Sequence, residues 1–180
     1  MNESKSKVIV LFGSSRPRPG SESYVQAYEL GKMLGATGYV VANGGYGGVM
    51  EAAARGAKEA GGETVGVTCE ALGRGGANQW IDKEIRTASL NERLGKLIGL
   101  GDGYVVLPGS TGTLLEIAMV WELINKRFLS ERPIIFLSDY WKPIIETVMQ
   151  AGEAEGGYIR FLDSLELVGE EVRKMLDIRC

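Results

Sequence analysis

Short apolar runs alternate along this chain with longer segments in which apolar residues recur at helical spacing. The runs predict β-strands at residues 8–12, 39–42, 64–68, 104–107, 133–137 and 165–168. The longer segments predict helices at residues 21–33, 49–60, 90–100 and 113–126, another from about residue 141 and a last one after residue 168. Strands that alternate with helices are typical of βα units around a parallel sheet. We therefore expect an α/β fold, a Rossmann-like, doubly wound and mainly parallel sheet flanked by helices, in one domain over residues 1–180.

Three of the predicted strands run into turns rich in glycine and hydroxyl residues, and a helix follows each turn. Open parallel sheets bind ligands at the carboxyl ends of their strands, where glycine permits close backbone approach and helix N-termini favour anions. Together the three turns predict a site for a phosphorylated small molecule of nucleotide size. The candidate binding residues are Gly13, Ser14, Ser15, Gly44, Gly45, Gly47, Pro108, Gly109, Ser110, Thr111, Gly112 and Thr113.

Composition restricts the chemistry available at such a site. The 180 residues include 26 glycines and no histidine. A Ser-His-Asp triad, a Cys-His pair and a His-ligated zinc are thereby excluded. Carboxylates, arginines, hydroxyls and backbone amides remain, and we expect neither a metal ion nor a bound cofactor.

Charge and cysteine content indicate which classes of partner and which cellular compartment to expect. The formal net charge is −3, and no basic block is present, which argues against nucleic-acid polymers as partners. Cys69 and Cys180 are expected to be thiols in a reducing compartment. No apolar run approaches the roughly 18 residues that a membrane helix needs. We therefore expect a cytoplasmic protein with no membrane partner.

Two common phosphate-binding motifs are absent. The pattern G-x-x-x-x-G-K-[ST] does not occur, so a P-loop kinase or NTPase has no support. The dinucleotide pattern G-x-G-x-x-G begins at Gly45 and Gly47 but meets Met50 where its third glycine should stand. Hydride transfer with a dinucleotide cofactor is therefore not favoured.

The helix after Thr113 carries the first catalytic candidate, Glu116. One interpretation is a capping box, because Thr113 and Glu116 have its spacing. However, this helix is apolar on nearly every side, and Glu116 shares a side with Val120 and Leu123. We expect a largely dry carboxyl with a raised pKa. A buried carboxyl beside an anion site fits a general acid or base.

Arg93 is the second candidate. Ser89 and Glu92 predict a capping box at the start of its helix, and Arg93 flanks the apolar stripe that follows. A cation near a helix N-terminus opposes the helix dipole, so a nearby anion would relieve the conflict. The alternative is an exposed or snorkelling arginine.

These residues together resemble the Lonely Guy family of cytokinin-activating nucleoside 5′-monophosphate phosphoribohydrolases, formerly labelled "possible lysine decarboxylase". The upstream arginine of the family aligns with Arg93, and order and spacing agree over residues 8–133. The chain also resembles molybdenum cofactor carrier proteins, which share the fold and the turns. It departs from the family pattern at Ser110, where glycine is usual, and at Leu94, where lysine is usual. The signature P-G-G-x-G-T-x-x-E is matched at Pro108, Gly109, Gly112, Thr113 and Glu116.

The resemblance implies hydrolysis of the N-glycosidic bond of a nucleoside 5′-monophosphate to free base and ribose 5-phosphate. Glu116 would stabilise the oxocarbenium-like transition state and orient water, and Arg93 would hold the ribose or phosphate. The three turns would bind the nucleotide. The alternative is a non-catalytic carrier of a nucleotide or of the molybdenum cofactor. A pyridoxal enzyme is not favoured, because no lysine stands in a recognisable motif.

The same helix also suggests self-association. Only one face of it can pack on the sheet, so we expect the opposite face, with Met119 and Trp121 or their neighbours, to meet another subunit. Relatives in the resembled family are commonly dimers through this helix. The expected assembly is a homodimer or a larger homo-oligomer. The alternative is that the C-terminal helices cover this face within one chain.

Overall fold

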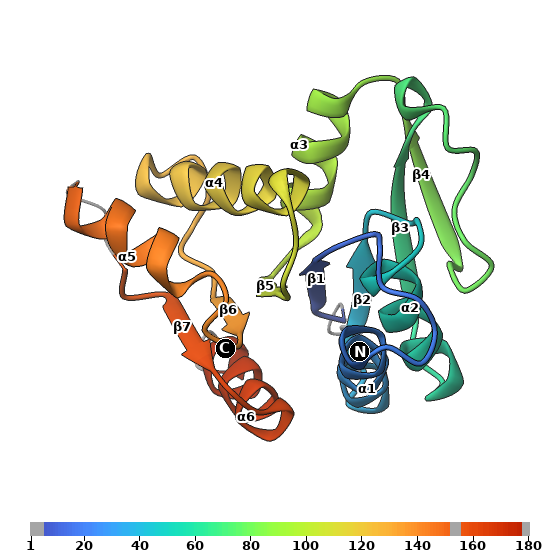
Figure 1. Cartoon of the computed structure of the whole chain (residues 1–180), viewed down its shortest axis with the longest axis horizontal. Helices are drawn as coiled ribbons and strands as arrows, with labels where there is room; N and C mark the ends of the chain where they lie inside the picture. Colours follow the sequence, from blue (N-terminus) through green and yellow to red (C-terminus); the bar gives the residue numbers. More distant parts are fainter. Residues whose placement is uncertain (1–5, 152–155, 178–180) are drawn as a thin grey trace, which may run out of the picture.

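Every strand in the computed structural model, which describes residues 6–151 and 156–177, pairs in parallel with its neighbours. The seven strands form one sheet in the order β4-β3-β2-β1-β5-β6-β7 (Figure 1). This all-parallel sheet confirms the predicted fold class. The strands are β1 (Val8–Phe12), β2 (Val40–Asn43), β3 (Thr64–Cys69), β4 (Lys83–Thr87), β5 (Gly103–Val106), β6 (Ile134–Leu137) and β7 (Ile159–Leu162).

Helices cover both faces of the sheet, so that the sheet lies between two helical layers (Figure 1). Helices α1, α2 and α6 pack on one face, and α3, α4 and α5 pack on the other. A single 3₁₀ turn, η1 (Glu70–Leu72), follows β3. The helices are α1 (Glu22–Ala36), α2 (Val49–Glu59), α3 (Leu90–Leu100), α4 (Thr111–Asn125), α5 (Lys142–Ala151) and α6 (Leu165–Asp177).

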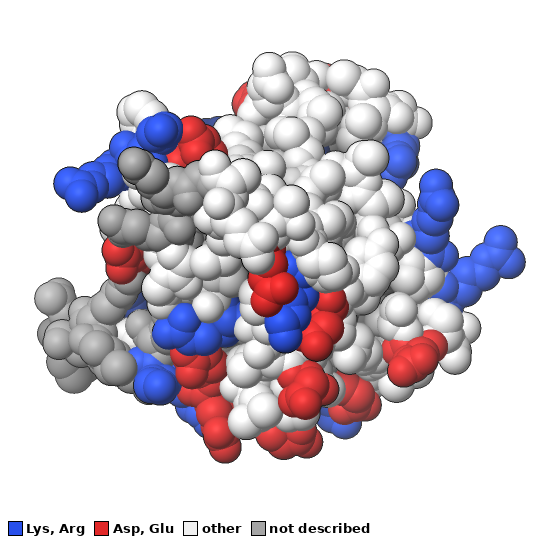
Figure 2. All heavy atoms as spheres, turned by 60° about the vertical axis from the view of Figure 1, so that its left-hand side comes forward, with Lys and Arg blue, Asp and Glu red and all other residues white. Residues whose placement is uncertain are grey.

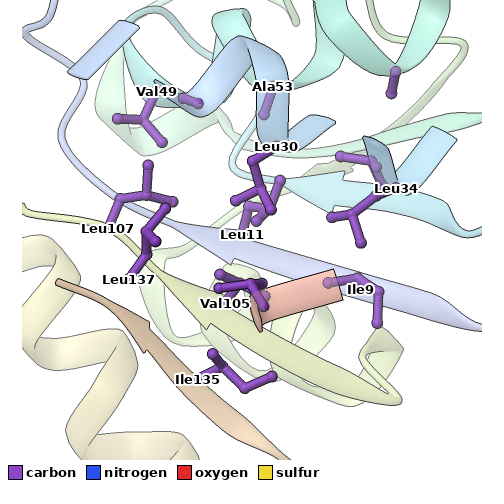
Figure 3. Close-up of a cluster of buried hydrophobic side chains, with 14 of the residues drawn as sticks. Ile9, Leu11, Leu30, Leu34, Val49, Ala53, Val105, Leu107, Ile135 and Leu137 are labelled. Carbon is purple, nitrogen blue, oxygen red and sulfur yellow. The ribbon is translucent and has the colours of Figure 1, made fainter. Parts of the chain in front are cut away.

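The central strands are apolar on both sides, because both of their faces are covered. In β1, Ile9 and Leu11 point into the cluster beneath α1, α2 and α6, while Val10 and Phe12 point into the cluster beneath α3, α4 and α5. Figure 3 shows the first cluster, where Leu30 of α1 lies against strand residues such as Leu11. The continuous apolar runs of the sequence thus correspond to strands buried on two sides.

The chain changes direction in the sheet between β1 and β5. Helix α1 leaves β1 toward one face, and α4 leaves β5 toward the other. In open α/β sheets, this strand-order switch opens a crevice at the carboxyl ends of the two strands. The loops that follow β1 and β5 therefore flank the position where this fold binds ligands.

Many glycines serve close helix packing rather than the crevice. A side chain at Gly31 or Gly35 of α1 would overlap the backbone of Ala53 or Ala57 of α2. A side chain at Gly56 would likewise overlap the backbone of Tyr28. Some of the 26 glycines thus let α1 and α2 approach each other closely.

Two strands differ from the sequence-based prediction. Strand β4 was not predicted, because it is a charged edge strand that pairs only with β3 and leaves Lys83 exposed. The predicted strand at residues 165–168 is wrong: these residues begin α6, and β7 precedes them. Val168, Val172 and Leu176 are all buried, and their spacing of four residues is helical.

The structure also bears on the predictions about the cap of α3, the cysteines and membrane-spanning helices. Ser89 Oγ accepts a hydrogen bond from the Glu92 amide at 3.2 Å, which confirms Ser89 as the cap of α3. The Glu92 carboxylate accepts from the Ala88 amide at 3.0 Å instead of the Ser89 amide, so the reciprocal half of the predicted capping box is not formed. Cys69 is a buried free thiol, and Cys180 lies outside the described residues. Among the helices of the described ranges, none combines the length and apolar character needed to cross a bilayer.

Candidate functional site

The three glycine-containing turns meet at the carboxyl edge of the sheet. The Ser14 amide donates to the Pro108 carbonyl at 3.2 Å, which joins the turn after β1 to the turn after β5. The Val49 amide at the start of α2 donates to the Ser14 carbonyl at 2.9 Å. Gly48 has a φ of +69°, and a side chain there would overlap the backbone of Ser14 and Ser15. The convergence that the sequence predicted is therefore present.

A cavity of about 310 Å³ opens between these turns. Of the candidate binding and catalytic residues, nine line it, and Gly44, Gly45, Gly47, Pro108 and Gly109 do not. The lining also includes five residues that were not predicted. The full lining is Gly13, Ser14, Ser15, Tyr46, Met50, Leu72, Arg74, Leu90, Arg93, Ser110, Thr111, Gly112, Thr113 and Glu116.

The candidate residues behind the lining shape the turns. The Gly45 amide donates to Asn43 Oδ1 at 2.8 Å, and the Gly45 carbonyl accepts from the Asn78 amide at 2.8 Å. A side chain at Gly109 would overlap Thr113. These glycines are thus required for the path of the backbone that carries the lining residues.

Helix α4 presents an open N-terminus to the cavity. It begins at Thr111, with Ser110 as the N-cap, and the Ser110 side chain makes no capping hydrogen bond. This start is two residues earlier than the predicted one, so the capping box of Thr113 and Glu116 does not form. The amides of the first helical turn lack intrahelical acceptors and carry partial positive charge. The geometry is that of an anion-binding helix end.

Arg93 is buried, so the snorkelling interpretation is wrong. Only 7% of the residue is exposed. Its Nε donates to the Val67 carbonyl at 2.8 Å, and one terminal nitrogen donates to the Gly44 carbonyl at 3.3 Å. A side chain at residue 44 would overlap the guanidinium, so Gly44 makes room for it. The backbone after β2 and β3 therefore fixes Arg93 in place.

The remaining terminal nitrogen of Arg93 faces Glu116. It lies 3.9 Å from Glu116 Oε1, and the two side chains are 8% and 12% exposed. Burial raises the pKa of Glu116 to about 7, and the charge of Arg93 opposes this rise without cancelling it. The predicted dry carboxyl with a raised pKa is confirmed. At neutral pH this carboxyl can both accept and donate a proton.

The five unpredicted lining residues have little in common in the sequence. Tyr46 and Met50 belong to the turn after β2 and the start of α2, Leu72 and Arg74 follow β3, and Leu90 begins α3. Leu72 and Leu90 are 38% and 40% exposed and together form an apolar rim of the cavity. The glycine-rich composition of residues 70–79 was a signal for a loop at the site, but no residue type singled out Arg74.

Comparison with known proteins places this chain in a family. A family described as the SLOG cluster4 family matches residues 6–159. The chain belongs to the SLOG cluster4 family. An uncharacterised protein of Archaeoglobus fulgidus is 34% identical over 116 residues, which are 64% of this chain and 75% of that protein. The family match over residues 6–159 includes every residue that lines the cavity, and both catalytic candidates are among them.

Solved structures share the architecture of this SLOG cluster4 member. TM1055, a structural genomics target, is 28% identical with a TM-score of 0.77 and covers 93% of this chain and 99% of its own. The molybdenum cofactor binding protein of Rippkaea orientalis is 24% identical with a TM-score of 0.77, covering 96% and 99%. A Moco carrier protein of Chlamydomonas reinhardtii is also 24% identical, with a TM-score of 0.77 over 97% and 99%. At this identity the last two show the fold.

Proposed function

We propose that this protein hydrolyses the N-glycosidic bond of a nucleoside 5′-monophosphate to free base and ribose 5-phosphate. The observation that carries the proposal is the buried pair of Arg93 and Glu116, 3.9 Å apart, in one cavity with the uncapped N-terminus of α4. The 5′-phosphate would lie at this helix end, on the amides and hydroxyls of residues 110–113. Ser14 and Ser15 would contact the phosphate and ribose from the turn after β1.

Glu116 is the group suited to the bond cleavage. As the bond between C1′ and the base nitrogen breaks, its electron pair leaves with the base and positive charge develops on the ribose. A nearby carboxylate stabilises that charge. Water then bonds to C1′ and passes a proton to Glu116, whose pKa of about 7 fits a general base at neutral pH. Glu116 returns this proton, directly or through solvent, to the base nitrogen that left with the electron pair, so that the free base is neutral and the carboxylate is restored. Arg93 orients the carboxyl and keeps part of it ionised.

The proposal is tested by incubating the protein with a set of nucleoside monophosphates and measuring release of ribose 5-phosphate. Glu116→Gln keeps the size of the side chain and removes its proton-accepting oxygen. We expect it to bind the substrate and to lower turnover about 10²–10⁴-fold. Glu122→Gln is the matched control, because Glu122 is an exposed glutamate of the same helix, and it should leave turnover unchanged. Binding of monophosphates without release of any ribose 5-phosphate by the wild type would exclude the hydrolase.

A second candidate is a non-catalytic carrier of a nucleotide or of the molybdenum cofactor. It is favoured by Leu94, which is buried and apolar where the resembled hydrolase family has a lysine after the arginine. Two proteins, one named as a molybdenum cofactor binding protein and one as a Moco carrier protein, also share the fold over nearly the whole chain. A carrier needs the phosphate turns but no proton transfer. In that case the wild type would release no ribose 5-phosphate, and Glu116→Gln would leave the affinity for the bound nucleotide or cofactor unchanged.

We also propose that the protein self-associates through α4 and α5. A groove of about 710 Å³ runs between these helices, with Leu114, Trp121 and Val148 in its lining. Figure 2 turns this side of the molecule forward and shows a broad uncharged area next to several charged side chains. Glu122 and Lys126, which also line the groove, form an ion pair with each other. Trp121 is only 5% exposed and Met119 is half-buried against the same apolar cluster, so the expected outer position of Trp121 is not met. Leu115, which is 43% exposed, faces outward instead.

A further inference from the structure

The lining of the cavity divides into two ends along the sheet edge. Residues that follow β1 and β5, namely Ser14, Ser15 and residues 110–113, form what we call the anion end. Tyr46, Met50, Leu72, Arg74 and Leu90 follow β2, β3 or β4 and form the apolar end. The strand order β4-β3-β2-β1-β5 separates the two sets. Adjacent strands are about 4.8 Å apart, so β3 and β5 stand about 14 Å apart, which matches the length of a mononucleotide.

Arg74 supplies the hydrogen-bonding side chain of the apolar end. Leu72, Leu90 and Met50 are apolar. The Tyr46 hydroxyl is already engaged at both its donor and its acceptor sites, because it donates to the Cys69 carbonyl at 3.2 Å and accepts from the Cys69 amide at 2.9 Å. Within the described residues, Arg74 has no ion-pair partner, and its guanidinium instead lies over the Tyr46 ring, 5.5 Å from the centroid.

This contact leaves the N–H donors of the guanidinium available, because Arg74 makes no hydrogen bond or ion pair within the described residues. A guanidinium carries five N–H donors in its plane and no acceptor. Contact with an aromatic face orients the plane and does not use those donors. Gly73 and Gly75, with φ of +61° and +76°, turn the chain on either side of Arg74, and neither is in contact with the rest of the protein at its Cβ position. Residues 73–75 therefore place Arg74 at the cavity, and the two glycines do not pack against the rest of the protein.

A donor-only side chain discriminates between purine bases. The Hoogsteen edge of an oxo-purine such as guanine or hypoxanthine presents two acceptors, O6 and N7, which match the paired donors of an arginine. Adenine presents N7 beside an amino group, which is itself a donor and repels an arginine N–H. Arg93 also lies over the Tyr46 ring, at 5.4 Å from the centroid, but its Nε and one terminal nitrogen are bonded to backbone carbonyls. Arg74 can thus recognise the first kind of edge and not the second.

We propose that Arg74 makes this protein selective for oxo-purine nucleoside monophosphates, by paired hydrogen bonds from its guanidinium to O6 and N7 of the base. The assignment rests on the proposed function for the class of ligand, a nucleoside monophosphate, and adds the class of base. Arg93 and Glu116 come from the helices that follow β4 and β5 and meet between the two ends of the cavity, where the ribose joins the base. Arg74 is accordingly a specificity-determining residue with no part in bond cleavage.

The test is a binding measurement by calorimetry with GMP, IMP, AMP and ribose 5-phosphate, made on the Glu116→Gln protein so that no ligand is consumed. We expect GMP and IMP to bind about tenfold or more tightly than AMP. Arg74→Ala should remove this ratio and leave the affinities for AMP and ribose 5-phosphate unchanged. Arg74→Lys keeps the charge but loses the paired donors, and should also lose most of the ratio. Arg173→Ala, at an exposed position of α6 on the other face, is the control and should change nothing.

The outcomes separate the base assignment from the proposed hydrolysis. AMP binding as tightly as GMP, or an unchanged ratio in Arg74→Ala, would overturn the role of Arg74 alone. A full ratio in Arg74→Lys would overturn the paired geometry. If ribose 5-phosphate and all three nucleotides fail to bind, the ligand class of the proposed function fails together with this inference. The ratio is measured without turnover, so a carrier that hydrolyses nothing can still confirm it.

Discussion

At the scale of single residues, the carboxyl group of Glu116 is buried in surroundings that favour its neutral form. Its pKa is raised from 4.5 to about 7 by burial, although Arg93 lies 3.9 Å away. Each pKa unit corresponds to about 1.4 kcal/mol, so ionised Glu116 lowers the free energy of unfolding by about 3 kcal/mol. That is a considerable share of the roughly 5–15 kcal/mol by which domains are stable. A group retained at such a cost is more consistent with function than with support of the fold.

The destabilisation predicts a pH dependence of unfolding. The folded protein holds the Glu116 proton up to about pH 7, whereas the unfolded chain releases it near pH 4.5, so stability falls as the pH rises through this interval. Glu116→Gln cannot ionise. We expect its free energy of unfolding to equal that of the wild type near pH 4 and to exceed it by about 3 kcal/mol at pH 8. Urea unfolding of both proteins across this range is the measurement, and a constant difference between them would contradict the raised pKa.

At the scale of elements, the start of α4 shows how far the sequence could be interpreted. The apolar period predicted the helix, and Glu116 was recognised as a buried residue because Val120 shares its side. The capping-box spacing placed the start at Thr113, whereas the helix begins at Thr111 with an uncapped end. A spacing rule assumes that the helix satisfies its own first amides. Here Ser110 makes no capping bond, so the amides are left open to the cavity. The preceding turn predicted an anion site at this helix end, but not the earlier and uncapped start of the helix.

Gly112 in the first turn of α4 allows a direct test of that open end. Adding a methyl group meets no atom within 4 Å, so Gly112→Ala fits the fold and should raise the free energy of unfolding by up to about 1 kcal/mol. The methyl group also enters the anion end, and we expect it to weaken binding of ribose 5-phosphate about tenfold. Denaturation and calorimetry on the same sample measure the two effects.

The control for this variant is Gly95→Ala in α3. Gly95 is likewise exposed in a helix and has no atom within 4 Å of an added Cβ, but it does not line the cavity. It should give a similar gain in stability with unchanged binding. If Gly112→Ala also leaves binding unchanged, the phosphate does not lie at the N-terminus of α4.

At the scale of the whole molecule, the chain order accounts for what could be predicted of the site. The turns at Gly13 and Pro108 follow predicted strands, and the position of the strand-order switch places them together. Three residues of the apolar end lie in the chain just before or after β4, namely Leu72, Arg74 and Leu90. Strand β4 was not predicted, because its charged residues do not give an apolar run. The grouping of the three residues depends on the order of strands in the sheet, which residue patterns do not encode. The apolar end was therefore not predictable, whereas the anion end was.

The outer side of α5 argues for a second subunit. Ile145 is buried against the sheet, while Ile144 and Val148 are 43% and 47% exposed and lie one helical turn apart. Both line the groove beside α4, where the Trp121 Nε1 is buried without a hydrogen-bond partner among the described residues. An exposed apolar stripe beside an apolar groove is typical of a surface that is covered in an assembly.

We expect sedimentation of the wild type to show a dimer or a larger oligomer and Val148→Asp to shift it to the monomer. Burying an unpaired carboxylate costs several kcal/mol, so the dissociation constant should rise by about 10²-fold or more. Val25→Asp is the matched control, because Val25 is 49% exposed on α1 at the opposite face, and it should leave the assembly intact. A monomeric wild type, or dissociation by both variants alike, would contradict an interface at α4 and α5.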